Sequence, residues 1–345
     1  MATQTQIIAD DPAVKADRGT GVVRRFLDHH FLHFNSREVL AAARAYESHL
    51  DTGGRMMVTL GGAMSTAKIG RTLSRMIRQD KVHAITCTGA NLEEDLFSLL
   101  AADDYELCPE WRTLSPADEQ ALRDRGMNRV TDTCIPEMAM RQLEGCLLER
   151  WTAACQADDC RMPYEFFYDI LHDGQLEPLD PARAEESWMI AAVEKDIPIY
   201  VPGWEDSSTG NFFTASVLRG LILHHRCVKT GTEQMEHLVR WYLNHCNQGT
   251  DKSGVGFFQI GGGIAGDFPI CAVPLIIQDL KRTDTPFWDY FCQISDAVTS
   301  YGGYSGAVPN EKITWGKLDV DTPRFMIQSD ATIVVPLIFA YVLGD

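Results

Sequence analysis

Long apolar runs, paired cysteines and metal-binding motifs are all missing from this sequence of 345 residues. No stretch approaches the roughly 18 apolar residues that a membrane-spanning helix needs, and the polar N-terminus lacks the apolar core of a secretion signal. The ten cysteines are scattered without a CxxC pair, which is typical of reduced thiols, and the histidines show no HExxH pattern. We therefore expect a soluble cytoplasmic protein without a metal site or membrane contact.

Basic residues are also scarce, because 31 lysines and arginines stand against 48 aspartates and glutamates, a formal net charge of -17. The negative charge is spread over the whole chain instead of forming a tail. Such a charge disfavours binding to nucleic acid or anionic lipid and suits a cationic ligand such as a polyamine. Many acidic proteins, however, are acidic simply because charge keeps them in solution.

Six short apolar runs alternate with helical patterns from residue 55 onward. They are RMMVTL, HAITCT, IPIYV, VGFFQI, YFCQIS and FMIQS. Because the runs are continuously apolar, they are typical of parallel strands that are buried on both faces. The sequence therefore predicts an α/β fold, with a doubly wound, mostly parallel Rossmann-like sheet and helices on both of its faces.

Two segments depart from this alternation. Residues 1–20 have no apolar period, and we expect a mobile N-terminal arm there. Residues from about 102 to 185 are polar and interrupted by prolines, with two helical stretches, so we interpret them as a helical insertion in one domain that spans residues 21–345. Asn35 and Glu38 form an Asn-x-x-Glu pattern, which predicts a capping box at the start of the first long helix.

Four of the apolar runs end in turn-forming residues before a helix, where a doubly wound sheet places its ligands. The first turn, TLGGAMST, suits a phosphate at an expected helix N-terminus. The carboxylates of the second turn could simply stabilise the dipole of the helix that follows. No turn is a GxGxxG motif, so their convergence on one sheet edge is the stronger signal. The four sets are Gly61, Gly62, Ser65 and Thr66; Thr88, Gly89 and Ala90 with Glu93, Glu94 and Asp95; Glu205, Asp206, Ser207 and Ser208; and Gly261, Gly262, Gly263 and Asp267.

A long glycine-rich loop near the C-terminus holds Trp315 beside the Gly316-Lys317 step. Loops of this length are usually functional. A lysine becomes a nucleophile when desolvation or a neighbouring cation lowers its pKa, and an indole beside it supplies an apolar wall. Lys317 is therefore a candidate nucleophile, although most lysines are solvated surface charges.

Four motifs in order along the chain resemble the deoxyhypusine synthase family. They are TGANLEEDL at 88–96, EDSSTGN at 205–211, WGK at 315–317 and SDA at 329–331. WGK followed by SDA at this spacing is the most specific of them. The segment HFLHFNSREV is similar to the bacterial deoxyhypusine-synthase-like group.

The resemblance implies an NAD-dependent transferase that oxidises spermidine, holds the butylamine as an imine on Lys317 and passes it to an acceptor amine. It also implies that Trp315 packs on the substrate chain and that Glu311 binds a substrate ammonium. The family forms homotetramers built from dimers, with sites at the dimer interface, so Lys317 and the cofactor could come from different chains. The positions that the resemblance assigns to NAD are Ser65, Thr88, Gly89, Glu94, Asp206, Ser208, Gly261, Gly262, Gly263, Ser305, Asp330 and Ala331.

The sequence departs from the family pattern in the part of the pocket that grips the polyamine. Asn211 and Tyr304 stand where the family has aspartates, Asp267 where it has a histidine, and Cys271 where it has an asparagine. Asp267 could replace the histidine as the catalytic base, or it could bind an ammonium or guanidinium. We therefore expect a changed donor or acceptor amine.

These observations leave several functions open. We expect an aminobutyl transferase with a small amine acceptor, similar to a homospermidine synthase. Deoxyhypusine synthesis on a lysine of a translation factor, with a protein as acceptor, is the main alternative, and a relative that uses agmatine is a third. A different class is an inactive protein that binds NAD or polyamine. The presence of Lys317, Glu311 and Trp315 together disfavours it, because a binder needs no nucleophile.

Overall fold

The structure is a computed structural model that describes residues 21–176, 178–246, 254–282, 284–299 and 305–345. The expected arm at residues 1–20 and the candidate residue Tyr304 lie outside the described residues. Within the described part of the chain, no helix is both long enough and apolar enough to cross a membrane.

A six-stranded sheet forms the centre of the molecule, and all of its neighbouring strands are parallel. The strand order is β6-β2-β1-β7-β8-β9, so the chain builds outward from β1 in one direction, returns to the middle, and builds outward in the other. This order confirms the predicted doubly wound fold and places a reversal between β1 and β7. The strands are β1 (Arg55–Leu60), β2 (Ala84–Cys87), β6 (Ile199–Tyr200), β7 (Val255–Ile260), β8 (Tyr290–Ile294) and β9 (Arg324–Ile327).

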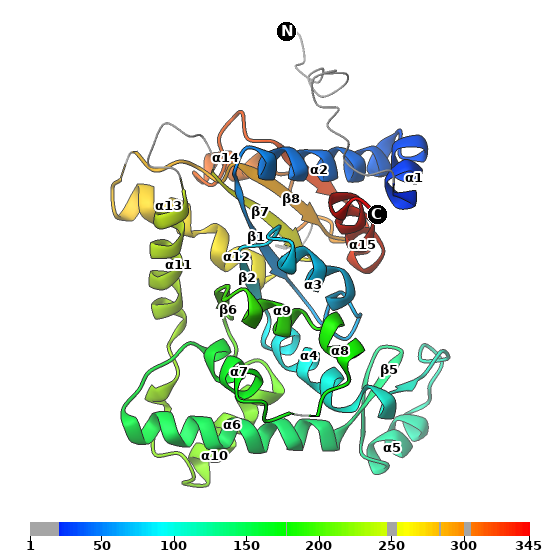
Figure 1. The fold of residues 1–345 in the computed structure, drawn as a ribbon, viewed down its shortest axis with the longest axis vertical. Helices are drawn as coiled ribbons and strands as arrows, with labels where there is room; N and C mark the ends of the chain where they lie inside the picture. The colour runs from blue at the N-terminus through cyan, green and yellow to red at the C-terminus, as the bar shows by residue number, and fades with distance from the viewer. Residues whose placement is uncertain (1–20, 177, 247–253, 283, 300–304) are drawn as a thin grey trace.

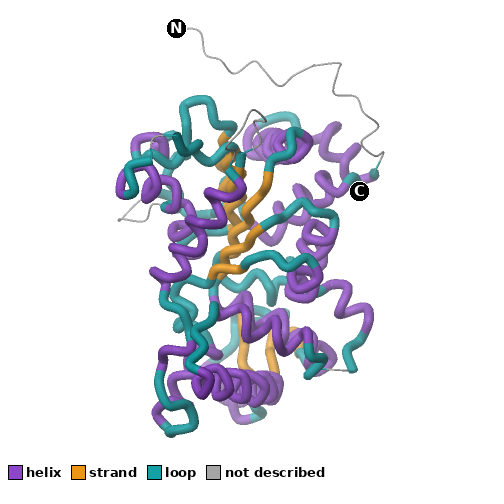
Figure 2. The backbone as a smooth tube through the Cα atoms, turned by 60° about the vertical axis from the view of Figure 1, so that its left-hand side comes forward, coloured by secondary structure: helices purple, strands orange, loops and turns teal. Residues whose placement is uncertain are grey.

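Helices cover both faces of this sheet, as the apolar runs predict (Figure 2). Successive residues of a strand point to opposite faces, so Met56 and Val58 join one apolar cluster while Met57 joins another. The first face is covered by α2 (Phe34–Asp51), α3 (Gly70–Arg78), α4 (Gly89–Ala101) and α15 (Ala331–Leu343); the second is covered by α11 (Gly231–His245), α12 (Ile264–Ile270) and α13 (Ala272–Pro274).

The segment from 102 to 185 contains helices, as expected, and also a three-stranded antiparallel sheet that the sequence did not predict. Its long helix α6 runs across the lower end of the molecule in Figure 1. Trp151 of α6 is buried in the same cluster as the first face of the central sheet. The elements of this segment are η2 (Ala102–Asp104), β3 (Glu106–Leu107), α5 (Pro116–Asp124), β4 (Met127–Val130), β5 (Thr133–Pro136), α6 (Glu137–Ala157), α7 (Pro163–His172) and α8 (Pro181–Glu186).

Shorter elements complete the described chain. They are α1 (Val22–His30), α9 (Trp188–Glu194), α10 (Ser208–Leu218), η3 (His225–Cys227), η4 (Leu275–Asp279) and α14 (Glu311–Thr314). One predicted helix start is wrong. The helix begins at Phe34 and not after Asn35, and the Asn35 amide instead donates to the Gln328 carbonyl at 2.9 Å, just after β9. The side chain therefore joins two elements and caps neither.

Candidate functional site

The strands β2, β1, β7, β8 and β9 end side by side, and backbone hydrogen bonds continue just beyond them. In each case the residue that follows a strand donates its N–H to the last carbonyl of the neighbouring strand. These bonds of 2.8–3.2 Å join Thr88 to Leu60, Gly61 to Ile260, Gly261 to Ile294 and Ser295 to Ile327. Three of the four predicted turns, those after β1, β2 and β7, therefore converge on one edge of the sheet.

The turns after β1 and β7 touch each other at the reversal of strand order. A Cβ atom on Gly61 would lie 2.8 Å from the carbonyl oxygen of Gly262, and one on Gly262 would lie 2.4 Å from the Ser305 hydroxyl. Gly261 and Gly263 have φ angles of +77° and +80°, a region that favours glycine. The structure thus brings together the glycine turn and Ser305, and only glycine permits the close approach.

The loop after β1 differs from the prediction of a helix N-terminus there. Residues 62–69 form turns, with positive φ angles at Gly62 and Lys68, and α3 begins only at Gly70. The predicted phosphate site on this loop therefore lacks a helix dipole. Ser65 is buried; its hydroxyl donates to the Asn91 carbonyl at 2.6 Å and accepts from the indole of Trp188 at 2.9 Å.

The turns after β2 and β6 also pack against each other. Thr88 caps α4, and its hydroxyl donates to the carbonyl of Gly62 at 2.7 Å. A Cβ atom on Gly89 would lie 2.6 Å from Cβ of Ser207, the residue that caps α10. The side chain of Asn91, a residue that sequence reasoning missed, donates to the Gly62 carbonyl and accepts from Ser65 N–H at 2.9 Å. Nothing in the sequence singles out Asn91, because the same helix also contains the polar residues Glu93, Glu94 and Asp95.

Three successive carboxylates of α4 each bind a different segment. Glu93 accepts from the first N–H groups of α10, at Ser208 and Thr209, with distances of 2.9 and 2.7 Å. Glu94 accepts from Thr66 N–H at 3.3 Å in the turn after β1. Asp95 accepts from the Ser187 hydroxyl and from Met189 N–H at the start of α9. The expectation that they stabilise the dipole of their own helix is wrong, because they lie beyond its first turn.

Burial shapes the acidity of these carboxyl groups. It raises the pKa of Glu94 to about 7, and the neighbouring charge of Glu93 adds to the effect, whereas the hydrogen bond from Thr66 N–H opposes it. Burial also raises the pKa of Asp95 to about 6. Thr66 Oγ1, beside Glu94, is buried and has no hydrogen-bond partner among the described residues. A buried carboxylate beside a hydroxyl that lacks a hydrogen-bond partner can bind the hydroxyl groups of a ribose.

The remaining cofactor candidates lie in the turns after β6 and β9. Asp330 caps α15 by accepting from Thr332 N–H at 2.8 Å, and Ala331 begins that helix in a buried position. Asp206 is exposed, and the N–H group of Ser208 is bound by Glu93.

Lys317 is held by a sharp reversal after α14. Its N–H donates to the Lys312 carbonyl at 3.0 Å, and its own carbonyl accepts from Trp288 N–H at 3.3 Å. Gly316 has a φ of +66°, which turns the chain back. The Lys317 Nζ atom lies 5.9 Å from the centre of the Trp315 ring, and the indole is 62% exposed. The ammonium therefore lies beside an aromatic face, as the sequence predicted.

A second lysine belongs to the same group. Lys312 Nζ lies 4.9 Å from the centre of the Phe291 ring on β8. Burial lowers the pKa of Lys312, and the charge of Lys317 lowers it further, whereas the charges of Asp267 and Glu311 raise it. The structure therefore brings Lys317, Glu311 and Asp267 into one charged cluster, together with a lysine that sequence reasoning missed. The only signal for Lys312 in the sequence is its position five residues before Lys317.

Two other pocket candidates are not bonded to this cluster. Asn211 is exposed on α10, and Cys271 ends α12 beside the apolar cluster of the second face. Among the residues that the structure describes, the backbone hydrogen bonds of Lys312 and Lys317 reach neither residue. Within the same residues, no group of three His, Cys, Asp or Glu side chains could hold a metal ion.

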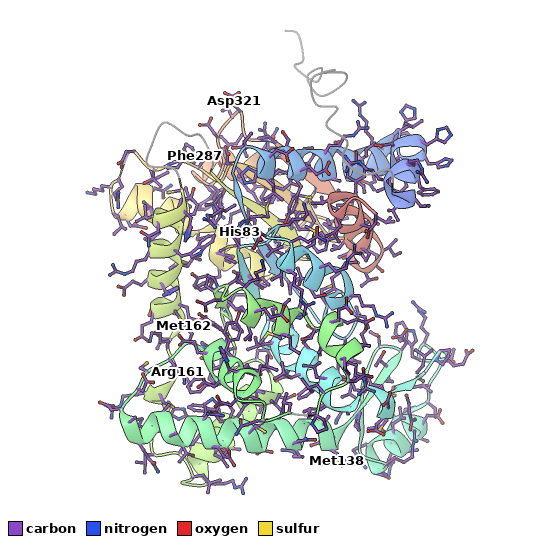
Figure 3. The ribbon with its side chains drawn as sticks, in the orientation of Figure 1. His83, Met138, Arg161, Met162, Phe287 and Asp321 are labelled. Atoms are coloured by element: carbon purple, nitrogen blue, oxygen red, sulfur yellow. The ribbon has the colours of Figure 1, made fainter. Side chains whose placement is uncertain are left out.

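The turn that holds Lys317 and the glycine turns lie at opposite ends of the strands. Lys317 pairs with Trp288, before β8 begins, whereas the turns follow the ends of the strands. Phe287 and Asp321, which precede β8 and β9, both lie in the upper part of Figure 3, the end at which Figure 1 places α14. Five residues of a strand span about 15 Å, so the Lys317 backbone is well separated from the cofactor turns of its own chain. Asp267 lies in the first turn of α12, directly after the glycine turn that follows β7.

The family model and the similar sequences point to one family. A family model described as deoxyhypusine synthase matches residues 28–342. A "Deoxyhypusine synthase-like protein" of Cyanothece is 29% identical over 330 residues, which cover 92% of this chain and 78% of the relative. A "Probable deoxyhypusine synthase 2" of Methanosarcina mazei is 26% identical over 307 residues, which cover 88% of this chain and 81% of the relative.

The fold is also similar to a solved structure. A crystal structure described as a "putative deoxyhypusine synthase" from Entamoeba histolytica has a TM-score of 0.55 against this chain. The match covers 91% of this chain and 90% of the other, at 13% sequence identity. At this identity the likeness shows a shared fold.

Proposed function

This chain belongs to the deoxyhypusine synthase family, and on that premise we propose that it is an NAD-dependent transferase that moves an aminobutyl group between amines through an imine on Lys317. The observation that carries the proposal is the cluster around Lys317. A lysine beside an exposed indole, with two carboxylates nearby, can both bind a cationic amine and attack it.

The residues at the sheet edge fit an NAD molecule. Glycines at the reversal of strand order permit close approach of a pyrophosphate, and Glu94 and the unpaired Thr66 hydroxyl suit a ribose. The Ser65 hydroxyl already has two partners within the chain, so we assign it to holding α4 and Trp188 in place. Bound NAD would accept a hydride from the donor carbon next to nitrogen and return it at the end of the reaction.

The chain's own residues would perform the transfer between these two hydride steps. Loss of hydride leaves a C=N bond on the donor; the uncharged Lys317 amine adds to its carbon, and the original amine leaves with the proton. An acceptor amine then adds to the Lys317 imine and displaces the lysine, and the returned hydride reduces the new C=N bond. Trp315 covers the alkyl chain of the substrate, and Glu311 binds its ammonium.

We propose a small amine as the acceptor, as in a homospermidine synthase. The support is the changed pocket: Asn211, Asp267, Cys271 and Tyr304 differ from the family pattern of the polyamine contacts. Deoxyhypusine synthesis on a protein lysine is the alternative, and it needs an open route to Lys317 for a folded partner. Agmatine as donor is favoured by one observation, the carboxylate of Asp267, which can pair with a guanidinium.

Trapping the imine with borohydride tests the proposed chemistry. With NAD and a series of amine donors, we expect reduction to add the mass of an aminobutyl group to Lys317, as read by mass spectrometry of peptides. Lys317→Met should abolish the adduct. Lys195→Met should leave it unchanged, because Lys195 is paired with Asp80 far along the sequence from the site. An inactive binding protein would form no adduct with any donor, and that result would overturn the proposal.

A further inference from the structure

The charged groups that act on Lys312 balance one another before any substrate binds. The groups that act electrostatically on Lys312 are Lys317 from the turn after α14, Glu311 from α14 itself and Asp267 from α12. With Lys312 itself, these groups are two lysines and two carboxylates. A site that binds a polycation by charge needs an excess of negative charge, and these four groups have none.

Lys312 occupies the kind of place that an ammonium ligand would take. Its Nζ atom lies over the Phe291 ring, whose side chain is fully buried in the second face of the sheet. An aromatic face with carboxylates nearby is the environment that proteins use to bind organic ammonium groups. Here that environment holds an ammonium of the protein.

The acidity of Lys312 is consistent with its placement inside the cluster. Burial is the main cause that lowers its pKa, and repulsion from Lys317 is the next. The carboxylates of Asp267 and Glu311 act in the opposite direction and favour the charged form. Their charges are thus partly used in holding Lys312.

We propose that Lys312 determines the donor specificity of this site by filling one ammonium position, so that the site takes a donor with a single cationic group besides the reacting nitrogen. This inference rests on the proposed function. Lys317 must be uncharged to attack, and the cluster then holds two carboxylates against one ammonium. One substrate cation restores neutrality, whereas a triamine brings two.

The donor class that fits is an α,ω-diamine or its guanidino analogue. With a diamine, hydride leaves the carbon next to one amine, Lys317 adds to the resulting C=N bond, and ammonia departs with the proton. The second ammonium of the donor stays bound beside the carboxylates of Glu311 and Asp267. A guanidinium carries the same single charge, so charge alone does not separate the two donors.

Donor competition in charge variants tests this inference. Putrescine, agmatine and spermidine are each offered to the full-length protein with NAD, and kcat/KM is measured for each. We expect the natural chain to favour putrescine and agmatine, which carry one cationic group besides the reacting nitrogen, over spermidine, which carries two. Lys312→Met should move the ratio about tenfold toward spermidine, because it leaves a carboxylate for a second cation. Lys312→Arg keeps the charge and should change the ratio by less than about twofold.

The outcomes separate this inference from the proposed function. A natural chain that favours spermidine, or a folded Lys312→Met variant with an unchanged donor ratio, would overturn the role of Lys312 while the imine chemistry stands. An adduct on Lys312 in place of Lys317 would overturn it as well. If no donor forms any adduct, the proposed function itself fails. Thermal unfolding of both variants shows whether a complete loss of activity is caused by a loss of fold. If a variant is folded but inactive, calorimetry can compare its affinities for the three amines in place of the kcat/KM values.

Discussion

Glu94 has a buried carboxyl group whose charge changes near neutral pH. Its pKa is raised by burial to about 7 from an ordinary value of 4.5. The folded chain therefore binds this proton more tightly than the unfolded chain. The resulting stabilisation is complete below about pH 4.5 and is lost as the pH rises through about 7.

Replacing Glu94 by glutamine should remove this dependence on pH. As the pH rises from 4.5 to 8, the natural chain loses up to about 3 kcal/mol of this stabilisation, and Glu94→Gln does not. The free energy of unfolding of the variant minus that of the natural chain should therefore increase by that amount. Urea denaturation over that range measures the difference. Glu110→Gln, at an exposed position, is the matched control. Parallel curves for Glu94→Gln and the natural chain would show that the buried carboxyl is not the cause.

Among the structural elements, the turns at the reversal of strand order allow a direct test of packing. Gly61→Ala would place a Cβ atom 2.8 Å from the backbone oxygen of Gly262, which cannot rotate away. We expect a loss of about 1–3 kcal/mol in the free energy of unfolding. Gly145→Ala is the control, since nothing lies within 4 Å of its Cβ position in α6.

The control should behave in the opposite way. Alanine is favoured over glycine within a helix, so Gly145→Ala should stabilise the protein by about 0.5–1 kcal/mol. Chemical denaturation at one pH compares the two variants. Equal stability of Gly61→Ala and the natural chain would mean that the two turns can separate.

Elements with strong apolar patterns could be predicted from the sequence almost to the residue. VGFFQI matches β7, and ATIVVPLIFAYVL matches α15, because continuous burial needs continuous apolar sequence. The small antiparallel sheet could not be found in this way. Its strand Glu106–Leu107 is exposed, so no burial pattern marks it. The start of α3 was missed because turns at Gly62 and Lys68 have no apolar period.

The candidate site could be predicted by residue type but only partly by position. Glycine turns and the WGK lysine carry local signals, and the turns do meet at one edge. Lys312 and Asn91 carry none, because their roles come from Phe291 and Ser65, which folding brings to them from distant parts of the chain. The carboxylates of α4 were recognised as important, yet their partners on other helices could be seen only in the fold.

At the scale of the whole molecule, the separation of Lys317 from its own cofactor turns favours sites that are shared between chains. Apolar side chains near both groups are exposed on the isolated chain, including Trp315 at 62% and Ile264 at 52%. Large exposed apolar side chains often mark contacts with another chain. A shared site would let Lys317 of one subunit face the turns of another.

Mixed oligomers test this arrangement. Lys317→Ala and Gly262→Val are each expected to be inactive, the first without the nucleophile and the second with a side chain that clashes with Ser305. If sites are shared, co-refolded mixtures should regain up to about a quarter of the natural activity, because one pairing in four restores a site. Mixing without refolding is the control. No recovery in a mixture with the natural oligomeric state would place each complete site within one chain.

Glu93, Glu94 and Asp95 follow one another on α4, yet they hold the start of α10, the turn after β1 and the start of α9. Successive residues of a helix point about 100° apart around its axis, which is how one short stretch reaches three neighbours. Inserting or deleting one residue between Thr88 and Glu93 would rotate all three carboxylates by that angle at once. The length of this helix should therefore vary less than its composition. An alignment of related sequences should show no insertion or deletion between Thr88 and Asp95.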